Sequence, residues 1–187
     1  MKKGLRVLLA ADGFVLFAFG LLIPIYAIFV EEIGGDVLDA GITYAVYLFF
    51  MGVFIYFVSR WENHQKHKEK LLIFSYVLFC FGAIGYFFVT SKYHLFLVQA
   101  IVGAAEAFNS PVYDGLYSKF LDKGKFVSEW GLYASMRSFV TAFAALAGGA
   151  LAFYFGFKAL FTVMLVFSIL GLLISLRLKR INKIGRV

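Results

Sequence analysis

The sequence contains a single cysteine, Cys80, which excludes a disulfide bond within the chain. It has only two prolines, and charged residues make up only 16% of it, whereas 62% of its residues are hydrophobic. Ordinary soluble domains contain about 45–50% apolar residues. The composition therefore excludes a typical soluble domain, and it predicts that Cys80 is a packing residue inside an apolar segment.

The sequence also lacks a polar segment long enough to form a soluble domain. Six apolar stretches fill it instead, each close to the ~20 residues that cross the ~30 Å hydrocarbon core of a bilayer as a helix. Their approximate bounds are 5–30, 37–59, 71–90, 93–116, 129–155 and 157–176. The first stretch is too long for the ~7–15-residue core of a signal peptide, and five more follow it. The sequence predicts an all-α membrane protein with one six-helix transmembrane domain over residues 1–187, so that function must lie in the bundle.

Positive charge is nearly absent from every second loop. Fifteen of the 18 Lys and Arg residues lie at the two termini or in the loops after the second and fourth stretches; only Lys92 and Lys158 lie in the other loops, and Arg137 falls inside a stretch. The positive-inside rule then predicts that both termini are in the cytoplasm and that all copies insert into the cell membrane in one orientation. This distribution, rather than binding to nucleic acid, accounts for the net charge of +7.

The two prolines begin similar segments, Pro24-Ile25-Tyr26 and Pro111-Val112-Tyr113. Similarly, Gly41 begins the segment GITYAVY and Gly131 begins GLYASMR. Because the first and fourth stretches run in opposite directions, these matches predict a 3+3 inverted repeat, an arrangement of secondary transporters that bind substrate near the midplane. The alternative is coincidence, because proline and glycine are common in membrane helices.

Polar residues inside the apolar stretches are the candidate functional residues, because a charge at the bilayer centre usually faces a cavity or a partner. Glu106 and Arg137 fall at similar depths in neighbouring stretches and are candidates for an ion pair. Gln99, Gly103, Glu106, Ser110 and Tyr113 follow the spacing of one helix face. The predicted substrate- or proton-binding residues are Asp12, Gln99, Glu106, Asn109, Tyr113, Asp114 and Arg137. The alternative for Glu106 and Arg137 is a purely structural pair.

Three segments resemble the N-terminal half of a transporter of the major facilitator superfamily. They are GLLIPIYAIFVEEIGG in the first stretch, LVQAIVGAAEAFNSPVYDGLYSKFLDKGK around the fourth and EWGLYASMRSFVTAFAALAGGALA in the fifth. The resemblance implies one six-helix half of that fold, with the first and fourth helices lining a central cavity. Members of the family alternate access by rocking two such halves around one site. The chain starts at Met1 and ends in a basic tail, so we expect it to be complete, and the missing half is then expected to be an identical, parallel copy.

Small residues at helical spacing provide candidate surfaces for that pairing, because they let helix backbones approach closely in lipid. By the resemblance, the second helix of one copy would meet the fifth helix of the other. The predicted dimer interface comprises Gly41, Ala45, Gly52, Ala144, Ala145, Gly148 and Gly149. The alternative is that these residues pack within the monomer.

The leading functional hypothesis is a secondary active transporter of a small solute, a parallel homodimer that works by a rocker-switch motion, with protons as a candidate coupling ion. A second hypothesis is a non-transporting membrane subunit that assembles with another membrane protein. We do not expect an enzyme, because no cluster of residues has catalytic spacing at bilayer depth. His64 and His67 have metal-ligand spacing but lie in a basic loop without a cysteine or carboxylate cluster, so neither a metal site nor a cofactor is predicted.

Overall fold

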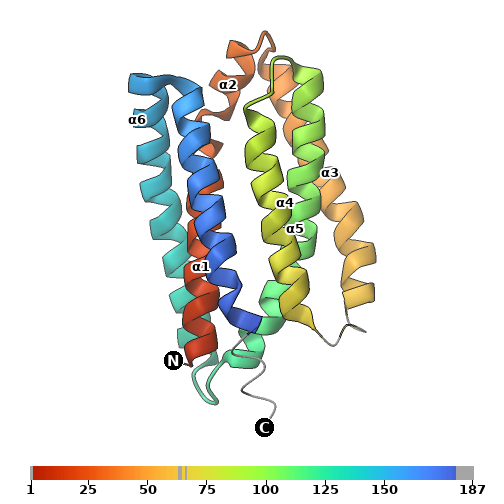
Figure 1. Ribbon diagram of the computed structural model, residues 1–187, viewed down its shortest axis with the longest axis vertical. Helices are drawn as coiled ribbons and strands as arrows, with labels where there is room; N and C mark the ends of the chain where they lie inside the picture. The colour runs from red at the N-terminus through yellow and green to blue at the C-terminus, as the bar shows by residue number, and fades with distance from the viewer. Residues whose placement is uncertain (1, 63–64, 66, 180–187) are drawn as a thin grey trace.

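The computed structural model describes residues 2–62, 65 and 67–179, and all regular secondary structure in this part of the chain is helical. The elements stand side by side in an elongated bundle (Figure 1). They are α1 (Lys3–Gly20), the short 3₁₀ helix η1 (Ile23–Ile25), α2 (Tyr26–Glu32), α3 (Val37–Glu62), α4 (Lys68–Tyr86), α5 (Lys92–Phe120) and α6 (Phe126–Ser175). The predicted all-α class is confirmed.

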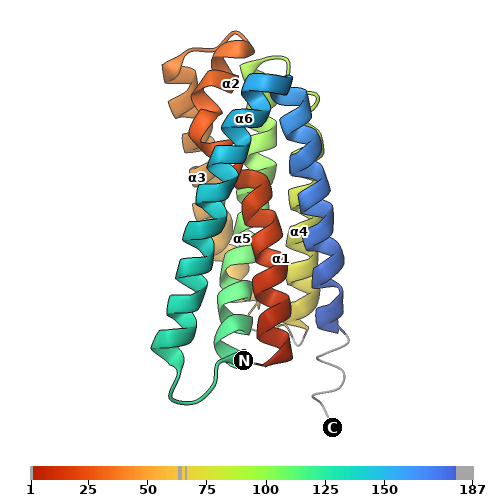
Figure 2. The same ribbon diagram turned by 90° about the vertical axis from the view of Figure 1, so that its left-hand side faces the viewer.

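Within the described residues, five helices are long and apolar enough to cross a membrane, whereas the sequence predicted six. The difference lies in α6, a 50-residue element that contains one residue with a non-helical backbone, Gly156 (φ 77°, ψ 172°). Glycine adopts this positive φ without the steric cost that a Cβ would add. The chain turns back there, so that residues 126–155 and 157–175, called here the first and second limbs of α6, lie beside each other (Figures 1 and 2). The six-helix count and the inverted repeat stay predictions.

The two Pro-x-Tyr segments differ in their local backbone. Pro24 lies in η1, between the end of α1 and the start of α2. Pro111 lies inside α5, which continues past it. Proline removes a backbone donor and crowds the preceding turn, so it often interrupts a helix. Only the first of the two segments shows this interruption, so the local backbone gives the predicted repeat no added support.

α1 is packed between the two limbs of α6. Gly148 of the first limb lies directly against the backbone carbonyl of Leu21, with no space for a Cβ atom. A Cβ on Gly171 of the second limb would meet Val15 of α1 at 2.7 Å. In membrane proteins, small residues let two helix backbones approach closely in this way, and the close packing holds the helices together.

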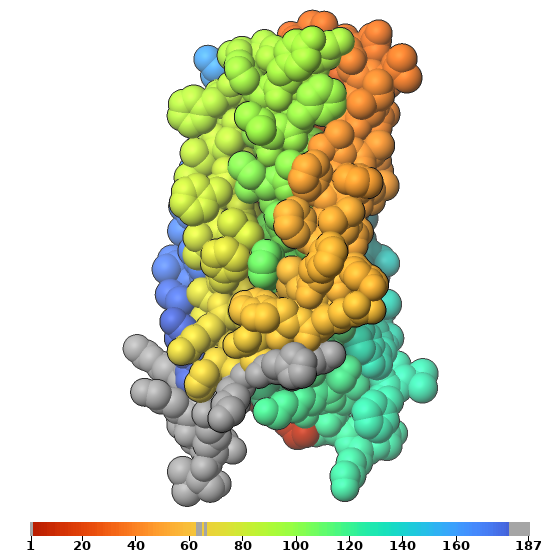
Figure 3. Space-filling view, turned by 90° about the vertical axis from the view of Figure 1, so that its right-hand side faces the viewer, coloured from red at the N-terminus to blue at the C-terminus, as the bar shows by residue number. Residues whose placement is uncertain are grey.

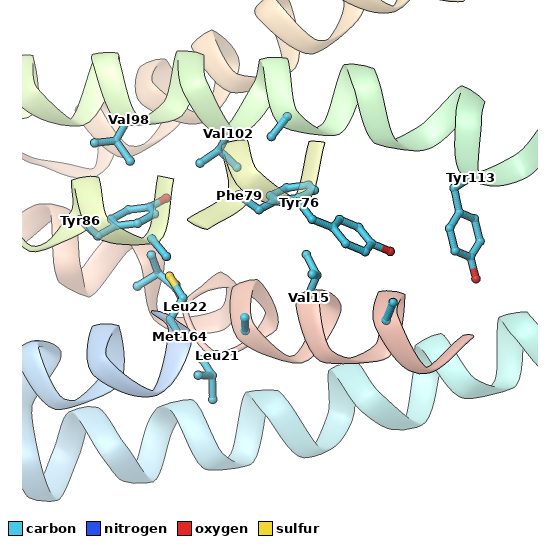
Figure 4. Close-up of a cluster of buried hydrophobic side chains, with 14 of the residues drawn as sticks. Val15, Leu21, Leu22, Tyr76, Phe79, Tyr86, Val98, Val102, Tyr113 and Met164 are labelled. Carbon is cyan, nitrogen blue, oxygen red and sulfur yellow. The ribbon is translucent and has the colours of Figure 1, made fainter. Parts of the chain in front are cut away.

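α5 has α3 on one side and α4 on the other, and the space-filling view shows a strip of α5 between them (Figure 3). α4 presents Gly82 and Gly85 to the side chains of Val102 and Val98 on α5. These valines, with Tyr86 and Phe79 of α4, belong to the buried core between α4, α5 and α1 (Figure 4). Cys80 is buried in α4, as expected of a packing residue.

The helix ends that carry most of the described Lys and Arg residues lie together at one end of the bundle. They are the starts of α1, α4 and α6 and the ends of α3, α5 and the second limb of α6, whereas the start of α5 and the turn at Gly156 lie at the opposite end (Figure 1). His64, Lys66, Arg180, Lys183 and Arg186 lie outside the described residues. Charge is thus segregated along the bundle, and the orientation of its ends in a membrane stays a prediction.

Candidate functional site

Two cavities lie next to each other in the bundle. The larger has a volume of about 450 Å³ and is bordered by α1, α3, α4, α5 and the first limb of α6. The smaller, of about 360 Å³, lies between α5 and the first limb, beside Trp130. Glu106, Asn109 and Arg137 line both, so the cavities adjoin at these residues. Both volumes fall in the ~300–1,000 Å³ range of small-molecule sites.

All seven residues that the sequence predicted for substrate or proton binding line one or both cavities. Asp12 and Gln99 line the larger cavity, Tyr113 and Asp114 line the smaller one, and the remaining three line both. Three helical elements supply them, because α1 contributes Asp12, α6 contributes Arg137 and α5 contributes the other five. The structure therefore brings these residues together, and their role in binding stays a prediction.

Three buried polar atoms beside the cavities have no hydrogen-bond partner among the described residues: Asp12 Oδ2, Tyr76 OH and Tyr113 OH. Asp12 is 5% exposed, and the two tyrosines are almost fully buried. Figure 4 shows both tyrosine rings extending from α4 and α5 into the space beside α1. A buried polar atom without a partner costs about 1–3 kcal/mol, so these atoms mark a place where a bound ligand or water would be stabilising. Tyr76 was missed by sequence reasoning, since a hydroxyl in an apolar helix has no distinguishing pattern.

Arg137 interacts with its own helix rather than with Glu106. Its Nη1 donates a hydrogen bond to Tyr133 OH at 2.8 Å, and its guanidinium carbon lies 5.5 Å from the centre of the Tyr133 ring. Among the described residues, no ion pair within 4.0 Å joins Glu106 to Arg137, so that expectation from the sequence is wrong. The physical reason is that Tyr133 lies one helical turn before Arg137, so its hydroxyl is within hydrogen-bonding reach of the guanidinium. Arg137 still attracts Asp12 and Glu106 at longer range.

A polar network joins α2, α3 and α5 at the end of the larger cavity farther from the N-terminus. Tyr26 OH donates to Thr43 Oγ1 at 2.7 Å and accepts a hydrogen bond from the side-chain amide of Gln99. Nearby, Lys92 Nζ lies 3.0 Å from Asp39 Oδ1 and pairs α5 with α3. Thr43 and Asp39 were not predicted as site residues, because nothing in the sequence pairs Thr43 with Tyr26 or Asp39 with Lys92.

The seven predicted interface residues fall into two groups. Gly41, Ala45 and Gly52 are exposed on α3, and Ala145 and Gly149 are half-buried on the first limb of α6. A Cβ added at Gly41, Gly52 or Gly149 would meet nothing within 4 Å.

Ala144 and Gly148 differ from these five. Both are buried, and they pack against Gly20 at the end of α1 and Leu21 directly after it, in the same chain. For these two residues the alternative of packing within the monomer is the one observed, so we remove them from the predicted interface. The interface role of the other five stays a prediction.

Comparison with known proteins gives a family and a fold. Residues 8–185 match the family described as Major Facilitator Superfamily, whereas no curated protein sequence matches significantly. Among solved structures, the chain is similar to one described as "Crystal structure of auto inhibited POT family peptide transporter", with a TM-score of 0.79 and 14% sequence identity. That similarity covers 96% of this chain but only 37% of the transporter, and at this identity it shows the fold alone.

The family match and the apolar helices together indicate a multi-pass membrane protein. The match is to a family of transporters, which are generally not enzymes. The earlier resemblance is confirmed: because the family match extends over almost the whole chain, the protein belongs to the major facilitator superfamily.

Proposed function

We propose that the chain is one half of a secondary active transporter for a small solute and works as a parallel homodimer. The observation that carries this proposal is the position of the two cavities. They bring Asp12, Glu106 and Arg137 to one side of the bundle, between α3 and the first limb of α6. α3 and this limb lie along the same side of the molecule (Figure 2). A second copy facing this side would complete the wall of a solute passage.

The helices that border the cavities also expose large apolar side chains. In α3 only 11% of the residues in the most apolar segment are buried. On the first limb of α6, Phe139, Phe143 and Leu146 are between 64% and 74% exposed. A two-fold axis along the membrane normal would set α3 of one copy against the first limb of the other and turn the cavities toward each other. The open space at Gly41 and Gly52 supports close approach there.

In the proposed mechanism, the two copies rock about the shared axis and open the central site to each side of the membrane in turn. Glu106 and Asp12 are the proposed proton carriers, because both carboxyl groups face the larger cavity. Exchange of a proton at either carboxyl group would change the charge of the solute site. A proton gradient would thereby be linked to solute movement.

Site-directed crosslinking tests the homodimer. Ala45→Cys and Ala145→Cys are introduced separately into two differently tagged copies with a Cys80→Ala background, and the copies are co-expressed. We expect disulfide-linked pairs that carry both tags in membranes. The matched control places cysteines at Phe81 and Leu173, which are exposed on α4 and on the second limb. A purely monomeric product, crosslinks at the control positions only, or capture of a different protein instead of the second copy would contradict the homodimer.

Transport is tested in liposomes with an imposed pH gradient and a panel of labelled small solutes. We expect at least one solute to accumulate with the wild-type protein, and Glu106→Gln to abolish the proton-driven component while crosslinking at Ala45 and Ala145 is unchanged. Ser110→Ala, an uncharged change in the smaller cavity, is the control and should retain coupling. Normal coupled uptake by Glu106→Gln would remove Glu106 from the mechanism.

A further inference from the structure

We infer that the larger cavity binds an organic cation with an aromatic or apolar body. This inference rests on the proposed function, because the ligand is taken to be the transported solute. It names the substrate class from the charges that face the cavity and from the side chains between them.

The charge balance of the cavity favours a cation. Asp12 and Glu106 both line it, and Arg137 is the one basic residue among the described residues of its lining. Arg137 is bound to Tyr133 rather than to a carboxylate. When both acids are ionised, the lining therefore carries a net negative charge. The carboxylate of Asp12 then repels the carboxylate of Glu106. A cation placed between them would relieve this repulsion.

Asp12 supplies an independent observation. It is 5% exposed, and its Oδ2 atom has no hydrogen-bond partner among the described residues although the residue lines the cavity. A buried carboxylate oxygen is an acceptor only, so its natural partner is a positive or hydrogen-donating group. Since Arg137, the one basic residue in the described lining, is hydrogen-bonded to Tyr133, an incoming ligand is left to supply that group.

The rest of the lining defines the body of the ligand. Aromatic side chains from α1, α2, α3 and α4 line the cavity together with the acids; they are Phe19, Tyr26, Tyr44, Tyr47, Phe79 and Tyr86. The faces of aromatic rings attract cations and repel anions, and they pack well against apolar groups. The carboxylates would repel an anion.

Two probes of the same shape and opposite charge test the inference: tetraphenylphosphonium, a cation, and tetraphenylborate, an anion. Equilibrium binding of each labelled ion is measured on the purified wild-type protein in detergent micelles, with protein-free micelles subtracted. We expect saturable binding of the cation and none of the anion. This comparison needs no variant, so a folding defect cannot obscure it.

Three variants then locate the site. Asp12→Asn and Glu106→Gln each keep the shape of the side chain and remove its charge, and each should weaken binding of the cation by about tenfold or more. Glu32→Gln is the control, because Glu32 is an exposed carboxylate at the end of α2 that lines neither cavity; its affinity should stay within about threefold of the wild type. Equal binding of the anion, or unchanged cation affinity in both cavity variants, would overturn the inference.

Binding at equilibrium requires neither a proton gradient nor turnover, which separates the two proposals. If the cation binds as expected but no crosslinked dimer or solute uptake is found, the proposed function fails and the ligand class stands. If a neutral or anionic solute is taken up with protons and the cation does not bind, the proposed function stands and the ligand class is overturned.

Discussion

α3 and α4 are consecutive in the chain and both pack on α5, yet they are held in different ways. In the most apolar segment of α3, 11% of the residues are buried, whereas in the most apolar segment of α4, 56% of the residues are buried. α4 is enclosed by apolar packing, with Val98 and Val102 of α5 set against its glycines and Tyr86 stacked on Phe161 of α6 at 5.3 Å. α3 is joined to α5 by a close backbone contact at Gly103 and by the ion pair of Asp39 with Lys92, and Tyr26 of α2 bridges Thr43 of α3 and Gln99 of α5.

This difference means that the position of α4 is set by packing within the chain, whereas the position of α3 depends more on what lies outside the chain. More than half of the residues in the most apolar segment of α4 are buried by the chain itself, and the cost of moving this helix is the loss of that packing. α3 leaves most of the residues in its most apolar segment uncovered by the rest of the chain. Gly82 of α4 illustrates the first case, since a Cβ there would meet Val102 at 2.6 Å, and Gly52 of α3 illustrates the second, since a Cβ there would meet nothing within 4 Å.

The largest effect is expected where α3 meets α5 by backbone. In Gly103→Ala, the new Cβ would lie 2.5 Å from the carbonyl oxygen of Tyr47 and 3.2 Å from the amide nitrogen of Met51, both on the α3 backbone. Neither atom can rotate away, so α3 must shift, and we expect a loss of about 1–3 kcal/mol in the free energy of unfolding. The measurement is denaturant unfolding in detergent micelles.

Gly52→Ala is the matched control for this change, because it lies on α3 in open space. Alanine is the better helix former, so this variant should gain up to about 1 kcal/mol or show no change. Equal stabilities for Gly103→Ala and Gly52→Ala would show that α3 is not seated on α5 as described.

A smaller effect is expected from the hydroxyl of Tyr26, which links α2 to α3 and α5. Tyr26→Phe removes the partner of Thr43 and of the Gln99 amide, and Gln99 is only 4% exposed. A buried amide that loses its partner costs about 1–2 kcal/mol in the free energy of unfolding. Tyr44→Phe, a half-exposed position in the same cavity, is the control and should change little. Equal effects of the two variants would show that the hydrogen bonds of the Tyr26 hydroxyl do not stabilise the position of α3.

Much of the fold follows from the sequence because long apolar runs and segregated charges are strong signals in a membrane protein. The helical class was predicted, and the boundary placed between residues 155 and 157 coincides with the turn at Gly156. Helical spacing also predicted which polar residues of α5 share a face, and the structure places that face at the cavities. Each of these predictions depends on the length of an apolar stretch or on the helical spacing of polar residues, and both can be read from the sequence.

The rest depends on which neighbour a side chain meets, and periodicity does not contain that information. Small residues give the same signal whether they face another copy or another helix of the same chain, so Ala144 and Gly148 were assigned with Gly149 although they contact α1. Arg137 was matched with Glu106 by depth, but its rotamer directs the guanidinium to Tyr133. Pro24 and Pro111 look alike in sequence, yet only the first lies at a helix interruption.

The smallest effect is expected from the ion pair between Lys92 and Asp39, the outermost link between α3 and α5. The Lys92 side chain is 40% exposed and its Nζ lies 3.0 Å and 3.1 Å from the two carboxylate oxygens of Asp39. Because exposed pairs are screened by solvent and salt, Lys92→Gln should lower the unfolding temperature less than Tyr26→Phe does. The difference from the wild type should shrink between about 0.05 M and about 0.5 M salt, whereas Lys158→Gln, at the same end of the bundle, should show no such trend. A loss that exceeds that of Tyr26→Phe and shrinks with salt would mean that α3 is held chiefly by charge, and the contrast with α4 would then be one of electrostatics rather than of packing. A loss that does not shrink with salt would show that Lys92 does not act through the ion pair.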